Sequence, residues 1–122
     1  MIYGIGVDIL ELERFEESLL RTGPPLLHRI CTQNEIAYCN GFAQPLSRFA
    51  ARFAAKEALS KALGVGIGSK LSWHDMEIIH DDHGKPMVLW HVDLFSLYGI
   101  THTHLSISHS NTLAIAYAIL ES

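Results

Sequence analysis

The chain has few of the features that mark several broad classes of protein. Its 122 residues include only two cysteines and four prolines. Two cysteines cannot form the disulfide framework of a small secreted domain. No apolar run approaches the roughly 20 residues of a membrane span, and the first residues lack the basic and apolar stretches of a secretion signal. We therefore expect a cytoplasmic protein that does not act in a membrane.

Basic residues are also scarce. Nine Lys and Arg stand against 13 Asp and Glu, which gives a net charge of −4. This balance disfavours a nucleic-acid binder, because such proteins are normally basic. Hydrophobic residues make up 48% of the chain, which excludes intrinsic disorder. The same apolar excess in a single domain spanning 1–122 favours a partner subunit that covers part of the surface.

The charge is distributed unevenly along the chain. The segment 20–61 holds six basic residues and two acidic ones, whereas the segment 62–122 holds two basic and six acidic residues. Two interpretations remain open for the basic middle. It forms ordinary solvated helix faces, or it forms a docking surface for an anionic partner such as a phosphate or an acidic protein.

Hydrophobic periodicity and turn residues predict an α+β fold, with a small antiparallel sheet packed on one long helix plus short helices. We expect a buried strand over 2–10 with Asp8 near its end. Thr32 and Glu35 form a capping-box pattern before a short helix. The other expected elements are helices over 12–20, from Pro24 or Pro25, over 33–39, over 47–63 and over 92–98, a hairpin of 76–80 with 87–90, and strands over 103–108 and 113–120.

The helix over 47–63 is the longest and the most apolar. Arg48, Arg52 and Lys56 recur every four residues and therefore share one face. We call these three residues the basic row. Glu57 and Lys61 are anomalies in a helix that we expect to be mostly buried. The helix ends at Gly64, the first residue of a glycine-rich turn. That turn lacks the spacing of a Walker loop or a dinucleotide fingerprint, so it is either a flexible helix cap or a phosphate-binding backbone.

Two acidic residues are the best candidates for chemistry. Asp8 ends an apolar strand and Glu57 lies within an apolar helix, and each is costly to bury alone. Their structural explanations are a helix N-cap for Asp8 and an (i, i+4) pair with Lys61 for Glu57. The functional alternative is that both carboxylates converge on a hard cation such as Mg²⁺. The eight histidines show no zinc-ligand spacing, and His109 is a turn residue on general grounds.

Four segments resemble the motifs of one family. They are Gly4-Ile5-Gly6-Val7-Asp8-Ile9, the segment 52–64 (RFAAKEALSKALG), Gly84-Lys85-Pro86, and the segment 105–110 (LSISHS). Together with Thr32 and Glu35 they resemble the holo-(acyl-carrier-protein) synthase family, the small bacterial class of 4′-phosphopantetheinyl transferase. The resemblance covers essentially the whole chain. His83 stands where many members of the family have Asn.

The resemblance implies an enzyme that moves phosphopantetheine from coenzyme A onto a serine of apo acyl carrier protein for fatty acid biosynthesis. The other product is adenosine 3′,5′-bisphosphate. It also implies Mg²⁺ as cofactor and a homotrimer with active sites between subunits. By matching position, Asp8 and Glu57 would be the metal ligands, and Lys61 would act with them in catalysis.

The resemblance also implies two binding surfaces. Coenzyme A would contact Arg52, Ser60, Lys61, Gly64, Gly84, Pro86 and His109. The acidic carrier protein would dock on Arg14, Arg21 and Arg29. Three alternatives remain: a coenzyme-A-binding regulatory module without catalysis, a structural oligomerisation domain, and an enzyme acting on the carrier domain of a polyketide or peptide synthase.

Overall fold

The computed structural model describes residues 1–122 and contains all the expected helices and strands, with ends within two residues of those predicted. The predicted α+β class is confirmed. The elements in chain order are β1 (Ile2–Glu11), α1 (Leu12–Thr22), α2 (Pro24–Ile30), α3 (Gln33–Asn40), α4 (Leu46–Leu63), the short 3₁₀ helix η1 (Trp73–Asp75), β2 (Met76–His80), β3 (Pro86–Trp90), α5 (Leu94–Tyr98), β4 (His102–His109) and β5 (Leu113–Glu121).

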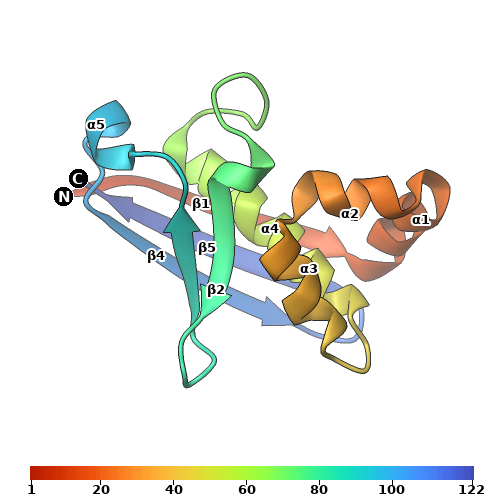
Figure 1. Ribbon diagram of the computed structural model, residues 1–122. Helices are drawn as coiled ribbons and strands as arrows, with labels where there is room; N and C mark the ends of the chain where they lie inside the picture. Colours follow the sequence, from red (N-terminus) through yellow and green to blue (C-terminus); the bar gives the residue numbers. More distant parts are fainter.

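The strands form two antiparallel sheets. One has the strand order β1-β5-β4, and the hairpin β2-β3 forms the other. Figure 1 shows the three long strands side by side, with both chain ends at one end of the sheet and α1 and α2 near the other. Helix α4 packs against all three strands. The hairpin is tied to β4 by the Trp90 indole, which donates to the Thr103 hydroxyl at 3.0 Å.

The core consists of two apolar clusters along α4. One lies between α4, the sheets and α5, where the helix contributes four small residues, Ala54, Ala55, Ala58 and Ala62. The second gathers side chains of α1, α2 and α3 against the first half of α4. The alanines bring the helix close to the strands, and α4 also packs against α1, α2, α3 and β2. None of the helices is long and apolar enough to cross a membrane.

Strand β1 differs from the buried strand that we expected. Its side chains alternate, and Ile5, Val7 and Ile9 are 56%, 53% and 61% exposed. They share the outer face of the sheet with Ile115 and Tyr117 of β5, which are also exposed. Only the inner face is covered by α4, because nothing in one chain packs on the other side. The sheet therefore presents an apolar surface to its surroundings, which we call the outer sheet face.

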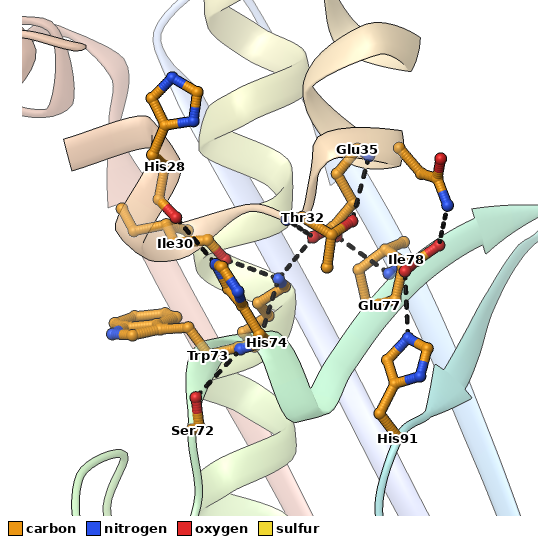
Figure 2. Close-up of polar contacts among 12 residues, drawn as sticks. His28, Ile30, Thr32, Glu35, Ser72, Trp73, His74, Glu77, Ile78 and His91 are labelled. Atoms are coloured by element: carbon orange, nitrogen blue, oxygen red, sulfur yellow. Dashed lines mark hydrogen bonds and ion pairs between the residues drawn. The ribbon is translucent and has the colours of Figure 1, made fainter. Parts of the chain in front are cut away.

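Lys56 also differs from the expectation for the basic row, which was an exposed face open to solvent or to a partner. Its side chain is fully buried, and its ammonium donates to Glu35 Oε1 at 2.6 Å, to the Ile30 carbonyl at 2.6 Å and to the Trp73 carbonyl at 3.1 Å (Figure 2). Glu35 in turn accepts from the backbone of Thr32 and Ile78. All three protons of Lys56 are bonded, so this residue joins α2, α3, η1 and β2 to α4 and offers no charge to a partner.

Candidate active site

The first part of the candidate site lies where β1 crosses α4. A Cβ atom at Gly4 or Gly6 would lie only 2.0 Å from the carbonyl oxygen of Ala62 or Ala58. Glycine is therefore required at both positions for β1 to lie directly on the helix. Because side chains alternate along a strand, Asp8 faces the helix like the two glycines. The close approach thus brings Asp8 to the last turns of α4.

Asp8, Glu57 and Lys61 meet at this crossing of β1 and α4, which we call the acidic crossing. The Lys61 ammonium donates to Asp8 Oδ1 and to the Val7 carbonyl, each at 3.0 Å. Lys61 therefore pairs with Asp8 rather than with Glu57, and Asp8 does not cap α1, whose N-cap residue is Glu11. Glu57 is partly buried. Burial and then the negative charge of Asp8 raise the pKa of the Glu57 carboxyl, while Lys61 opposes the rise.

This arrangement suits a divalent cation. Burial, and after it the negative charge of Asp8, disfavours the charged form of Glu57, and a cation between the two carboxylates would offset their repulsion. The chain has no group of three or more His, Cys, Asp and Glu side chains that could hold a metal ion. A cation held by only two carboxylates must complete its shell with water and substrate oxygens, which is how Mg²⁺ is usually bound.

Two further predicted residues adjoin this crossing. The Ser60 hydroxyl donates to the Glu57 carbonyl at 2.9 Å, so it is already bonded within the helix. Gly64 caps α4 in the left-handed conformation with φ 83°, which favours glycine. The turn that follows is open, because no atom lies within 4 Å of a Cβ built at Gly64, Gly66 or Gly68. Its backbone is accessible to a ligand beside Lys61.

The second part of the site is a pocket of about 130 Å³ near the other edge of the sheet. It contains four of the residues predicted to bind coenzyme A, and its lining consists of Arg48, Ala51, Arg52, His80, Gly84, Pro86, Ile107 and His109. His109 ends β4 rather than lying within the turn, as the sequence had indicated. We call this hollow the arginine pocket.

The arginine pocket is separated from the acidic crossing within one chain. Arg52 and Lys61 are nine residues apart on α4, which places them on opposite sides of the helix. Asp8 lies on β1 and His109 on β4, and β5 lies between these strands. The structure therefore collects the predicted residues into two groups at the two edges of one sheet.

Arg52 is an unusual cation. Its side chain is among the largest fully buried ones, the residue is 2% exposed, and its Nε atom has no hydrogen-bond partner. Its one polar contact is a 3.5 Å approach of Nη2 to His80 Nδ1, and none of the four ion pairs of the chain includes Arg52. A buried guanidinium without a counter-charge is costly, which makes the arginine pocket suited to an anion.

Sequence reasoning missed two residues of this pocket. Arg48 belonged to the predicted basic row but was not assigned to a ligand, although its spacing from Arg52 places both on one face. His80 had no recognisable signal, because its position depends on how the β2-β3 hairpin packs beside α3. Burial, followed by the charges of Arg52 and Arg48, lowers the pKa of His80.

The three arginines predicted to contact a carrier protein belong to neither group, and none of them lines the arginine pocket. Arg14 and Arg21 are on α1 and Arg29 is on α2, and all three are exposed. None forms an ion pair with an acidic residue of the chain. Their charges are therefore free to attract an acidic partner.

Comparison with known proteins agrees with both the fold and the motifs. The family model described as 4′-phosphopantetheinyl transferase superfamily matches residues 4–118. The holo-(acyl-carrier-protein) synthase of Koribacter versatilis is 43% identical over 124 residues, which cover 99% of each chain.

Solved structures lead to the same family. The crystal structure of the synthase from Neisseria meningitidis has a TM-score of 0.93 at 35% identity and covers 100% of both chains. The synthase from Bacillus anthracis, solved in complex with coenzyme A (3′,5′-ADP), has a TM-score of 0.85 at 43% identity and covers 100% of this chain and 98% of the other. With sequence motifs, family model and whole-chain structure in agreement, the protein belongs to the 4′-phosphopantetheinyl transferase superfamily.

Proposed function

We propose that this protein transfers 4′-phosphopantetheine from coenzyme A to a serine of apo acyl carrier protein and releases adenosine 3′,5′-bisphosphate. The observation that carries the proposal is the convergence of Asp8, Glu57 and Lys61 at the crossing of β1 and α4, in a chain that matches its family over almost its whole length. The relatives named above are holo-(acyl-carrier-protein) synthases, which supports the same reaction here and its place in fatty acid biosynthesis.

The chemistry is a phosphoryl transfer in which one bond forms and one breaks. The serine oxygen bonds to the phosphorus that carries pantetheine, the pyrophosphate bond to the nucleotide breaks, and the hydroxyl proton is released. Such transfers depend mainly on positioning and on neutralising charge at the phosphate oxygens. Asp8 and Glu57 would hold Mg²⁺, which supplies positive charge to the pyrophosphate when bound. Lys61 adds a cation beside the same oxygens.

The arginine pocket would take the nucleotide part of coenzyme A. Arg52 provides an unpaired buried positive charge, and Gly84, Pro86 and His109 provide the walls. The Gly64 turn lies beside Lys61 and would contact the phosphates that reach the acidic crossing. A ligand that needs both groups must bridge two edges of a sheet, and a second subunit can bring the edges together.

We therefore include in the proposal a homotrimer with active sites between subunits. The apolar outer sheet face supports it, because Ile5, Val7 and Ile9 are exposed in one chain and would be covered in an assembly.

We place the enzyme in the cytoplasm. Both cysteines are free and buried, and burial raises the pKa of the Cys31 thiol to about 12 and that of Cys39 to about 11, so neither is reactive.

The proposal is tested by the intact mass of an apo acyl carrier protein after incubation with this protein, coenzyme A and Mg²⁺. A gain of about 340 Da is expected from the transferred phosphopantetheine group, and EDTA should prevent it. Asp8→Ala and Glu57→Ala should abolish the gain while circular dichroism shows that both variants remain folded. No gain with several carrier proteins would favour a coenzyme-A-binding module without catalysis. If the carrier domain of a polyketide or peptide synthase is modified in preference to acyl carrier protein, that domain becomes the assigned substrate.

Charge reversal tests the docking surface. Arg14→Glu and Arg21→Glu should raise KM for the carrier protein by about tenfold, since each replaces an attraction by a repulsion, and should leave KM for coenzyme A unchanged. The loss should shrink at higher salt. Leu97→Glu, which adds a negative charge at a 62% exposed position of α5, is the control. Equal changes in both KM values would contradict a docking role for α1.

A further inference from the structure

Arg48 and Arg52 are both held by aromatic rings in the structure. The Arg48 guanidinium carbon lies 3.9 Å from the centre of the Phe42 ring, and that of Arg52 lies 4.6 Å from the centre of the Tyr38 ring. Neither arginine forms an ion pair with a carboxylate. Both line the arginine pocket. Aromatic faces therefore take the place that acidic side chains have beside most buried arginines.

The rings belong to one packed row. Tyr38 contacts Phe42 edge to face with the centroids 5.2 Å apart, and Tyr38 stacks on His80 at 4.7 Å and 10°. We call Phe42, Tyr38 and His80 the aromatic row. Tyr38 and Phe42 are four residues apart, like Arg48 and Arg52, so each ring meets one guanidinium. Helix α3 and the loop after it therefore place one ring against each arginine in the first half of α4.

An aromatic face holds a guanidinium without cancelling its charge. A carboxylate would fix the arginine equally well but would compete with an incoming anion, whereas a ring orients the planar group and leaves its full charge. The unpartnered Nε of Arg52 shows that this charge is not consumed within the chain. His80 presents Nδ1 to Arg52 at 3.5 Å, and because Arg only donates hydrogen bonds, that nitrogen is the acceptor.

We propose that Phe42 and Tyr38 are positioning residues that hold Arg48 and Arg52 for the phosphate on the nucleotide part of coenzyme A, away from the reacting pyrophosphate, and that Arg48 is a second anion-binding group of the arginine pocket. This inference rests on the proposed function. It adds residues that the family motifs do not include, since Tyr38, Phe42 and Arg48 all lie outside the four matching segments. The inference predicts that the ring face of Phe42 affects the binding of coenzyme A but not that of the carrier protein.

The steady-state kinetics of Phe42→Leu test the proposal. KM for coenzyme A should rise about threefold, the value expected for one partly exposed cation–π contact. The kcat and the KM for the carrier protein should stay unchanged, because the reacting atoms lie at the acidic crossing. Phe42→Tyr keeps the ring face and should keep the wild-type KM. Phe95→Leu, a matched change at a 66% exposed ring on α5, should have no effect.

A double-mutant cycle separates positioning from general packing. If Phe42 acts through Arg48, Phe42→Leu should leave KM for coenzyme A unchanged in an Arg48→Gln background. Multiplicative effects of the two substitutions would overturn the proposal, and so would equal loss of kcat and of binding in Phe42→Leu. If Phe42→Leu does not fold, a raised KM in Phe42→Tyr overturns it. Failure of the wild-type protein to modify any carrier protein would instead overturn the proposed function.

Discussion

Two cations one turn apart on α4 have opposite surroundings. Lys56 donates three hydrogen bonds and pairs with Glu35 inside the protein, whereas Arg52 is equally buried but has an unpartnered Nε and no carboxylate. The first arrangement is what a structural residue requires. The second is unfavourable unless a ligand supplies the missing charge. At the scale of single residues, this contrast indicates that Lys56 serves the stability of the fold and that Arg52 serves the binding of a ligand.

Removal of the Lys56 ammonium should therefore affect stability strongly. Lys56→Met leaves the Glu35 carboxylate buried and unpaired, and it should lower the free energy of unfolding by about 3–5 kcal/mol. Chemical denaturation followed by circular dichroism measures the change. Lys70→Met, at an exposed position in the turn after α4, should change stability by less than about 0.5 kcal/mol. A similar small loss in Lys56→Met would contradict the structural role of the pair.

Glu77 should give the protein part of its acid sensitivity. Burial alone would raise its pKa, but hydrogen bonds from His91 and Asn34 together lower it below the ordinary value of 4.5 (Figure 2). A lowered pKa means that Glu77 stabilises the fold above that ordinary value and that this contribution is lost as pH falls through the folded-state pKa. Glu77→Gln should thus flatten the stability curve as pH falls below the ordinary value of 4.5. Urea denaturation across this range measures the unfolding free energy of the wild type and of Glu77→Gln, with Glu13→Gln as control. Parallel pH dependences for the wild type and Glu77→Gln would contradict the prediction.

The contact between β1 and α4 is the decisive feature at the scale of elements. Glycines at two alternating positions of the strand let it lie on the helix backbone, and the same alternation turns Asp8 toward Lys61. The fold and the acidic crossing thus depend on one surface. A change that separates strand from helix should damage both.

Gly6→Ala makes this change with a single methyl group. The new Cβ would lie 2.0 Å from the Ala58 carbonyl oxygen, and because both atoms are tied to backbone, neither can rotate away. We expect a loss of about 2 kcal/mol or more in unfolding free energy and a loss of transfer activity. Gly66→Ala is the matched control, since no atom lies within 4 Å of its Cβ. Thermal unfolding of the two variants checks the prediction, and equal melting temperatures would refute it.

Local signals predicted most elements, and packing decided what local signals could not. Gly64 marked the end of α4 and the Thr32–Glu35 pattern marked the start of α3, because caps and turns act over a few residues. The outward face of β1 was not predictable, since an apolar run does not show whether one or two of its faces are covered. The placement of Asp8, Glu57 and Lys61 followed from family motifs. Arg48, His80 and the aromatic row depend on contacts between α3, α4 and β2, which no local pattern encodes.

At the scale of the whole molecule, the residues of the proposed site form two separate groups in one chain. The acidic crossing lies beside β1, and the arginine pocket lies beside β4 at the opposite edge of the sheet. The outer sheet face between them is apolar and exposed. These features are explained together if neighbouring subunits pair the acidic crossing of one chain with the arginine pocket of the next.

Complementation between two inactive variants tests this central claim most directly. Glu57→Gln should disable the acidic crossing, and Arg52→Gln should disable the arginine pocket. After equal amounts of the variants are mixed and their subunits exchanged, random assembly pairs an intact crossing with an intact pocket at about one site in four. The mass gain on apo acyl carrier protein should then appear at about a quarter of the wild-type rate, although each variant alone is inactive. A mixture that exchanges subunits but stays inactive would contradict the shared site.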